Sequence, residues 1–484
     1  MAAIHETVIM RCTLPVLLFS LCALPVFVRA DGQRLDLGGK TIKLALLGVA
    51  GWLPSKLPLE MVPEFARYAK EKYGYDASFT YDDAPLGTLF QKAASSLGTK
   101  SDDYALIVCD TQWLGALTER GWIVKLDDLI RRNPDLTPPW YDPVIESAYM
   151  EYPDNSGQKV ALPQEVDVLV LFVRKDLFRN PSERDAYRRL TGRDLPQTFE
   201  DWEKVDFDEY KAISKFFTRP GEGLYGTCLQ HSKEYDSESM SLYPIQWSMG
   251  GEFWNPKTHD VEGYLNTEVN AKGLEIQKSF LEVEPPGAVT YGVAENIKAF
   301  IEGRVATSQM WAGAGPAMIT GQNRDKVMVV PPPGAKQADG SIRRLYCIGG
   351  QAWVINNFAT REQKQVILDF LEWWYLPETQ REFARKGGNP AVKATLEDPN
   401  FDGINPWNRA MKYMLPFNRD FYHSPAYAEL LAIQQEAFSS YLTGVVNDPM
   451  KVLNWAAARQ QRVLYDLGDT RKKPAAAYLK LQLR

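Results

Sequence analysis

Tryptophans and hydrogen-bonding side chains recur together at the ends of the short β-strands that the sequence predicts. Trp52 follows a predicted strand over 41–47, and Asp110 follows a second over 104–109. Because ligands bind beyond the carboxyl ends of strands in open α/β sheets, such residues are candidates for a binding site. The candidate ligand contacts are Trp52, Asp110, Gln112, Trp113, Glu165, Asp167, Trp247, Gln309, Trp311, Gly350 and Gln351.

These residue types suit a ligand that carries hydroxyl groups. Hydroxyls require donors and acceptors at fixed positions, whereas the C–H faces of a sugar ring pack against indole planes. For any single tryptophan the alternative is packing in the core, and for Asp110 or Asp167 it is a helix cap or a surface ion pair. The pattern favours binding of a sugar or polyol.

The sequence patterns of catalysis, cofactor binding and metal binding each fail at an identifiable position. Residues 36–41 end like a phosphate-binding loop, but the first glycine of that motif falls on Arg34. Residues 398–403 start like a calcium-binding loop, but its twelfth position, which requires a carboxylate, is Arg409. No H-E-x-x-H or G-x-S-x-G motif occurs. We therefore expect no enzyme activity, no cofactor and no bound metal.

The balance of charge argues against nucleic acid as a partner. The chain has 61 acidic and 55 basic side chains and a formal net charge of −6, whereas nucleic-acid-binding proteins usually carry a basic stripe. At 484 residues the chain is too long for one hydrophobic core, which predicts two domains. Short β-like runs alternate with helical periods, and this alternation predicts an α/β fold with mostly parallel sheets.

The first thirty residues have the composition of a secretory signal. Arg11 precedes an apolar core over 14–28, and Val28-Arg29-Ala30 offers a cleavage site. The core is too short for a membrane span, which needs about 20 residues. We predict that residues 1–30 are a signal peptide cleaved before Asp31 and that the mature chain is periplasmic.

Local signals predict several helix ends. The pairs Thr198–Asp201 and Thr360–Gln363 have the pattern of capping boxes, and Gly74 is expected to end a helix over 62–73. The cysteines after the signal segment are odd in number and widely spaced, so at most one disulfide can form, and small buried side chains are the simpler interpretation. They are Cys109, Cys228 and Cys347.

Eight short segments occur in an order that one protein family shares. They are Tyr104–Trp113 with Leu126–Leu129, Ala161–Val168 with Val173–Leu177, Pro196–Trp202, Gly250–Glu252, Phe300–Ala306 with Trp311, Val330–Gly334, Gly349–Gly350 and Phe383–Pro390. In this order the chain resembles the extracellular solute-binding proteins of carbohydrate ABC transporters, the group that includes the maltose-binding protein. The resemblance covers essentially the whole chain after the signal segment.

The resemblance implies a two-lobe periplasmic-binding-protein fold with the ligand cleft between the lobes. It implies three hinge crossings, near Gln164–Asp167, Ser341–Tyr346 and Thr395–Gly403. Lobe one would comprise residues 32–163 and 346–396, and lobe two residues 166–340 and 403–484.

The resemblance also implies roles for single residues. Asp167 would lie in the first crossing and contact the ligand, so that Asp167→Ala would remove most of the ligand-induced shift in melting temperature and change that of the unliganded protein little. Gln112 would supply a polar contact, and Trp311 lies near the position of a stacking aromatic. The chain departs from the family at Thr307, where a Met is usual, and in an insertion over 179–195 to which no function is assigned.

The function implied is capture of a sugar or polyol by hinge closure and its delivery to the membrane permease subunits of an ABC transporter, by a monomer. One alternative keeps this transport role with a peptide or an organic acid as the ligand. An anion would need a convergent Arg or Lys, and the candidate residues include neither. The other alternative is a secreted carbohydrate-active enzyme, which would need two carboxylates at a fixed separation.

Overall fold

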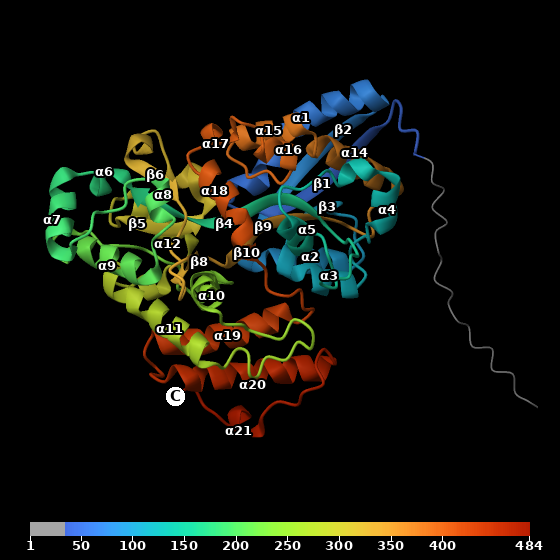
Figure 1. Cartoon of the computed structure of the whole chain (residues 1–484). Helices are drawn as coiled ribbons and strands as arrows, with labels where there is room; N and C mark the ends of the chain where they lie inside the picture. The colour runs from blue at the N-terminus through green and yellow to red at the C-terminus, as the bar shows by residue number, and fades with distance from the viewer. Residues whose placement is uncertain (1–33) are drawn as a thin grey trace, which may run out of the picture. The chain divides into compact units, whose positions relative to one another are not determined.

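The strand β4 (Leu162–Arg174) connects two halves of one sheet. In the computed structural model, which describes residues 34–484, residues 162–168 of β4 pair with β9 (Tyr346–Ile355). Residues 169–174 pair instead with β5 (Thr307–Trp311) and β6 (Val327–Val330). Every residue of β4 before Arg174 is buried, which explains its apolar run. The strand lies near the centre of Figure 1.

The main sheet has eight strands and is mixed. Its order is β2-β1-β3-β9-β4-β5, with β6 on β4 and β10 on β9. The remaining strands are β1 (Thr41–Val49), β2 (Asp76–Ala84), β3 (Leu106–Asp110), β10 (Asn418–Arg419) and a separate hairpin of β7 (Ala335–Lys336) and β8 (Ile342–Arg343). The β1–β2, β1–β3 and β9–β10 pairs are parallel, whereas β9 and β4 pair antiparallel with the other neighbours. The prediction of mostly parallel sheets is therefore only partly right, because β9 re-enters the first half of the sheet in the opposite direction.

The half of the sheet that contains β1 to β3 is covered by helices from two distant parts of the sequence, within residues 53–149 and 361–396. Phe65 of α1 packs edge-on against Phe370 of α14 with 5.3 Å between the ring centroids, and both rings are buried. The helices of this half, which we call the first lobe, are α1 (Leu53–Tyr73), α2 (Leu86–Gly98), α3 (Leu114–Glu119), α4 (Asp127–Arg132), α5 (Pro143–Tyr149), α14 (Arg361–Trp374), α15 (Pro377–Arg385) and α16 (Lys393–Leu396).

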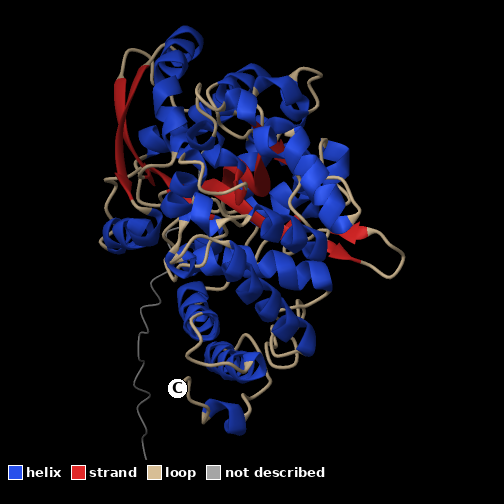
Figure 2. Cartoon of the chain, turned by 90° about the vertical axis from the view of Figure 1, so that its left-hand side faces the viewer, coloured by secondary structure: helices blue, strands red, loops and turns tan. Residues whose placement is uncertain are grey.

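The second lobe contains β5, β6 and the remaining helices. Figure 2 shows that helices surround the strands of the sheet. Helix α10 is buried along its whole length because α11, α19 and β9 contact it. The helices of this lobe are α6 (Lys175–Phe178), α7 (Pro181–Thr191), α8 (Phe199–Trp202), α9 (Phe207–Phe217), α10 (Ser237–Met249), α11 (Glu268–Phe280), α12 (Val293–Ile301), α13 (Gly315–Met318), α17 (Phe401–Ile404), α18 (Asn408–Met414), α19 (Tyr427–Leu442), α20 (Pro449–Leu467) and α21 (Ala476–Leu479). The lobe boundaries and the three crossings derived from the sequence stay predictions.

The local signals in the sequence act as expected. Both capping boxes form, at the starts of α8 and α14, and Gly74 ends α1 with a left-handed φ of 78°. Helix α1 begins at Leu53, earlier than predicted, because a proline is tolerated in the first turn of a helix. The three described cysteines are buried and unbridged, which confirms their interpretation as small core residues.

The predicted signal peptide, residues 1–30, lies outside the described residues. Within residues 34–484, no helix combines the length and the apolar character that a membrane span requires.

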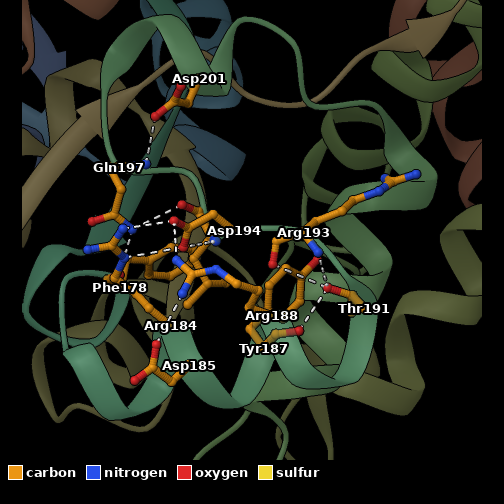
Figure 3. Close-up of polar contacts among 11 residues, drawn as sticks. Phe178, Arg184, Asp185, Tyr187, Arg188, Thr191, Arg193, Asp194, Gln197 and Asp201 are labelled. Carbon is orange, nitrogen blue, oxygen red and sulfur yellow. Dashed lines mark hydrogen bonds and ion pairs between the residues drawn. The ribbon is translucent and has the colours of Figure 1, made fainter.

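The insertion over 179–195 forms α7 and the turn that follows it (Figure 3). Asn180 caps the start of the helix, and Gly192 ends it. Asp194 then folds back onto the helix, where Arg184 and Arg188 each donate to its carboxylate at 2.8 Å. These hydrogen bonds, that of Arg184 first, lower the pKa of Asp194 to about 2. These ion pairs therefore hold the turn to α7, next to the buried side chain of Leu195.

Replacement of Asp194 by Asn should loosen this turn without unfolding the protein. Exposed ion pairs contribute only about 0–1 kcal/mol to stability, so we expect faster amide exchange over residues 181–195 and a nearly unchanged melting temperature. Hydrogen exchange followed by mass spectrometry measures the exchange over residues 181–195 and over the rest of the chain at once. Thermal unfolding measures the melting temperature. The control is Asp185→Asn, which removes a contact to Arg188 but leaves the turn attached. Unchanged exchange in Asp194→Asn would show that other contacts hold the turn.

Candidate functional site

A cavity of about 250 Å³ is lined by residues from both lobes and from the strands between them. The first lobe contributes the ends of β1 and β3, the second lobe contributes the start of α10 and the end of β5, and β9 forms the floor. The polar, aromatic and glycine residues of this ligand pocket are Gly51, Trp52, Asp110, Thr111, Gln112, Asp167, Asp236, Trp311, Gly349, Gly350 and Gln351.

Trp52 is held in place by a buried carboxyl group. Its indole Nε1 donates to Glu165 Oε1 at 2.5 Å, and Glu165 is fully buried. Burial first, and then the nearby charge of Asp167, raise the pKa of Glu165 well above its usual range. Glu165 does not line the pocket. It positions Trp52, so the structure places this predicted ligand contact one layer behind the cavity.

Two glycines of β9 allow close approaches beside the pocket, and one of them makes room for the indole of Trp311. A Cβ on Gly349 would lie 2.5 Å from Cζ3 of Trp311, so the ring rests directly on the backbone. Gly350 has a φ of 87°, and a Cβ there would lie 2.6 Å from the carbonyl oxygen of Glu165. The two glycines therefore have different roles, since Gly349 accommodates a side chain and Gly350 accommodates the backbone itself.

Asp167 joins three parts of the chain. Its carboxylate accepts from the backbone N–H of Gly313 at 3.1 Å and of Val168 at 2.8 Å, and from Nδ2 of Asn389 at 3.3 Å. Burial raises the pKa of Asp167 to about 7, although the backbone N–H groups act in the opposite direction. Asp167→Ala would leave buried donors without partners, which costs about 1–3 kcal/mol each. The expectation that this substitution hardly changes the unliganded protein does not fit these contacts.

A cluster of acidic groups forms the opposite wall of the pocket. The hydroxyl of Tyr235 lies 3.0 Å from Asp110 Oδ2 and 3.3 Å from Gln112 Oε1. Asp420 accepts from Thr111 Oγ1 at 2.6 Å and from Gln112 Nε2 at 3.3 Å. Burial, and then the charge of Asp420, raise the pKa of Asp110 to about 7.

Asp236 extends this cluster from the second lobe. Burial first, and then the charge of Asp110, raise the pKa of Asp236 well above its usual range. The charge of Asp110 thus acts on Asp236, and the two carboxyl groups interact electrostatically.

The sequence did not point to Tyr235, Asp236 or Asp420. All three lie in loops, and Asp420 is more than three hundred positions from the residues that it contacts. Two local features mark the loop before α10. Asp236 occupies the N-cap position, and Tyr235 has a φ of 47°, which is unusual for an aromatic residue.

The pocket offers hydrogen-bond acceptors and no cation. Gln351 is buried, and its Oε1 has no hydrogen-bond partner among the described residues. None of the described residues that line the pocket is Lys, Arg or His. The wall is therefore suited to a ligand that donates hydrogen bonds and carries no negative charge.

The other candidates from the sequence lie elsewhere. Trp113 lines an adjoining cavity of about 380 Å³, which shares Gln112 with the ligand pocket. Gln309 is buried inside β5 and lines neither cavity. Trp247 is fully buried in α10, against Tyr243 and Phe253. For Trp247, core packing is the correct interpretation.

The loop that resembles the start of a calcium site makes ordinary protein contacts. Asp398 accepts from the backbone N–H of Asn400 at 2.9 Å and from Arg381 at 3.1 Å, and Asp402 pairs with Lys412. Within the described part of the chain, no three His, Cys, Asp or Glu side chains converge as a metal site would require.

Asp110→Asn should reduce the pH dependence of stability. Because the pKa of Asp110 is raised to about 7, the folded chain binds this proton more tightly than the unfolded chain. Its contribution to stability is complete below the ordinary aspartate pKa of about 4 and is lost as the pH rises through about 7. We expect the wild-type melting temperature to fall more steeply between about pH 5 and pH 8 than that of the variant. Scanning calorimetry without ligand measures this slope. The exposed Asp102→Asn should behave as wild type, and a wild-type slope for Asp110→Asn would contradict the analysis.

Alanine substitutions at the two β9 glycines should have different effects, one on ligand binding and the other on stability. Gly349→Ala should displace the Trp311 ring, which changes the tryptophan fluorescence and weakens ligand binding while the chain stays folded. Gly350→Ala should lower the melting temperature by several degrees, because alanine is strained at this φ and meets backbone atoms. Equal losses of stability in the two variants would show that Gly349 also serves the backbone.

Comparisons with known proteins agree with this architecture. No curated protein matches the chain significantly. Among solved structures, an ABC transporter solute-binding protein from Agrobacterium radiobacter K84 in complex with ribitol is 24% identical, with a TM-score of 0.69 and coverage of 89% of this chain and 100% of that chain. Maltose-bound MalE3 of T. maritima is 18% identical, with a TM-score of 0.68 and coverage of 88% and 99%. A solute-binding protein from Agrobacterium vitis S4 with bound D-mannitol is 16% identical, with a TM-score of 0.63 and coverage of 89% and 99%.

These similarities confirm the predicted two-lobe fold of periplasmic binding proteins. The family model for bacterial extracellular solute-binding proteins matches residues 58–381. With the cleft between two lobes and this match over most of the chain, the protein belongs to the family of bacterial extracellular solute-binding proteins.

Proposed function

We propose that this chain is the exported substrate-binding component of an ABC importer, which captures a sugar or polyol and delivers it to the permease. The observation that carries the proposal is the composition of the ligand pocket. Two indole rings and three aspartates surround it, both lobes contribute, and no cationic side chain lines it among the described residues. Indole planes cover the C–H faces of a sugar, and carboxylates accept from its hydroxyls.

The negative charge of the pocket favours a sugar as the transported ligand over an organic acid. An organic acid would bring its negative charge beside Asp110, Asp167 and Asp236, with no Lys, Arg or His among the described lining residues to offset it. A volume of about 250 Å³ also favours a compact ligand over an extended peptide. Ribitol, D-mannitol and maltose in the structurally similar proteins are of the favoured kind.

Capture would occur by closure of the two lobes around the ligand. Trp52 from the first lobe and Trp311 from the second line the same pocket, and Tyr235 of the second lobe bonds Asp110 of the first. A ligand that contacts both lobes binds the closed form more tightly and shifts the population toward it. The closed form would then be recognised by the permease.

The engagement of Asp167 and Glu165 argues against a role for these two groups as a glycosidase pair. Such an enzyme needs one carboxyl group as an acid and another as a nucleophile or base. Both oxygens of Asp167 accept from the backbone N–H of Gly313, and Glu165 lies behind Trp52. These groups position other residues and are not free for chemistry on a ligand. We propose that the ligand leaves unaltered.

The proposed location of the protein follows from the predicted signal peptide, residues 1–30, and from the family to which the chain belongs. A cleaved signal peptide would export the chain to the periplasm, where it would act as a monomer with the membrane permease subunits. No nucleic acid and no cofactor would take part.

A thermal-shift screen of sugars and polyols tests the proposed function. A ligand at a hundred times its dissociation constant stabilises the folded state by about 2.7 kcal/mol, which corresponds to a rise of several degrees for lobes of this size. Trp311→Ala should weaken binding by about tenfold or more, since about 1.4 kcal/mol is a factor of ten. The control is Trp455→Ala, which removes a half-buried indole of the same lobe outside the pocket.

Three results would reject parts of this proposal. A shift with organic acids or peptides alone would keep the architecture and discard the ligand class. A chemically altered ligand, produced over many turnovers per chain, would favour an enzyme. A loss of stability in Trp311→Ala with unchanged affinity would assign that ring to the core.

A further inference from the structure

A second and larger pocket lies apart from the ligand pocket. Its volume is about 830 Å³, and it shares no lining residue with the ligand pocket. It is formed by α5 of the first lobe, the loop 252–264 of the second lobe and the segment 418–425 between them. Helix α5 contacts β10 at this point (Figure 1). The volume falls within the range of about 300–1,000 Å³ that is usual for small-molecule sites.

Aromatic rings form one wall of this second pocket. Trp254 lies 4.2 Å from Phe421 and 5.0 Å from Tyr422 between ring centroids. The ring of His259 stacks on Tyr422 at 4.7 Å with an interplanar angle of 16°. Trp254 and His259 are half-buried, so part of each ring is open to the cavity. Such faces suit the C–H surface of a cyclic saccharide.

Beside this wall, an acceptor of Asn418 and a donor of Arg419 are among the buried polar atoms that lack hydrogen-bond partners. Oδ1 of Asn418 and Nε of Arg419 are both buried without a hydrogen bond among the described residues, and both residues line the pocket. The terminal nitrogens of Arg419 are engaged by Glu252, at 3.2 Å and 2.8 Å. Buried polar atoms are rarely left unpaired. A hydroxyl group, which both donates and accepts, can serve the two atoms together.

Both cations that line the second pocket lie beside carboxylates. His423 lies 2.7 Å from Asp154 and 3.6 Å from Asp420. Burial alone would lower the pKa of His423, but the two neighbouring carboxylates, that of Asp154 first, raise it to about 10. With Arg419 paired to Glu252, the lining carboxylates, which also include Asp469, outnumber the cations Arg419 and His423. This excess disfavours an anionic ligand and is compatible with a neutral one.

We infer that the second pocket binds a neutral cyclic saccharide, in addition to the molecule in the ligand pocket. The inference rests on the proposed function, since it assumes that sugars are the ligands of this protein. Asp420 forms the wall between the two pockets. It lines the second pocket, and its carboxylate holds Thr111 and Gln112 of the first. A saccharide in the second pocket therefore contacts a residue that shapes the first.

Native mass spectrometry with D-glucose, maltose, ribitol and D-mannitol tests this inference through the number of molecules bound per chain. We expect at least one of the two cyclic saccharides to bind with a stoichiometry of two once the tighter site is saturated. Trp254→Ala should reduce this number to one and leave the tighter affinity unchanged. Trp311→Ala should weaken the tighter site alone. The matched control Trp455→Ala, in which another half-buried indole of the second lobe is removed, should still bind two.

The outcomes separate this inference from the proposed function. A stoichiometry of one for every sugar or polyol that binds overturns the second site and leaves the proposed function in place. If none of these compounds binds, both fall. Two molecules on Trp254→Ala would place the second site elsewhere and also overturn the inference. The wild-type number decides the question even if Trp254→Ala does not fold, and slower amide exchange over 418–425 in saturating saccharide then locates the second molecule.

Discussion

The buried carboxylate of Asp167 is the contact on which the junction of the two lobes depends. A carboxyl group in this position would be costly without hydrogen bonds, and its partners come from the loop after β5, from β4 itself and from Asn389 of the first lobe. Gly313 must be glycine for this contact, because a Cβ would lie 2.6 Å from Asp167 and 2.5 Å from Trp52. The same close approach brings the end of β5, and with it Trp311, to the pocket. One carboxylate thus sets the distance between the two indoles.

The acidic wall opposite this junction gives the ligand pocket an unusual electrostatic state. Asp110, Asp236 and Asp420 come from different segments, and burial first, then the negative charges of neighbouring members, raise the pKa values of Asp110 and Asp236. Tyr235 supplies one donor to this cluster, and no described lining residue supplies a positive charge. The carboxyl groups thus have too few hydrogen-bond donors. Hydroxyl groups of a ligand would supply such donors without adding a charge. The selectivity of the pocket therefore depends on the carboxyl acceptors that line it and equally on the absence of a cation among its described lining residues.

Much of the fold follows from local sequence signals, whereas only part of the site does. The strand ends at Trp52 and Asp110 can be located from sequence, because each is an apolar run that stops abruptly at polar or aromatic side chains. Trp247 and Trp311 cannot be told apart in this way, since burial of α10 on every side depends on helices that come much later in the chain. Gln309 lies inside β5 and not after it, because the strand continues to Trp311 and no turn residue in the sequence marks an earlier end. Asp420 contacts Thr111 only after the whole second lobe has formed.

The pairing of β4 with β9 has a mechanical consequence for any movement of the lobes. A register shift of one residue would reverse the face of every side chain, so two paired strands cannot slide past each other. Their twist can change, because the angle between neighbouring strands varies by tens of degrees among sheets. Movement of the lobes would therefore alter the twist of the sheet at β4 and β9 and leave the pairing of these strands intact. Trp52 and Trp311 line the same pocket from the two lobes, so a molecule that fills the space between them would favour one twist angle over the others.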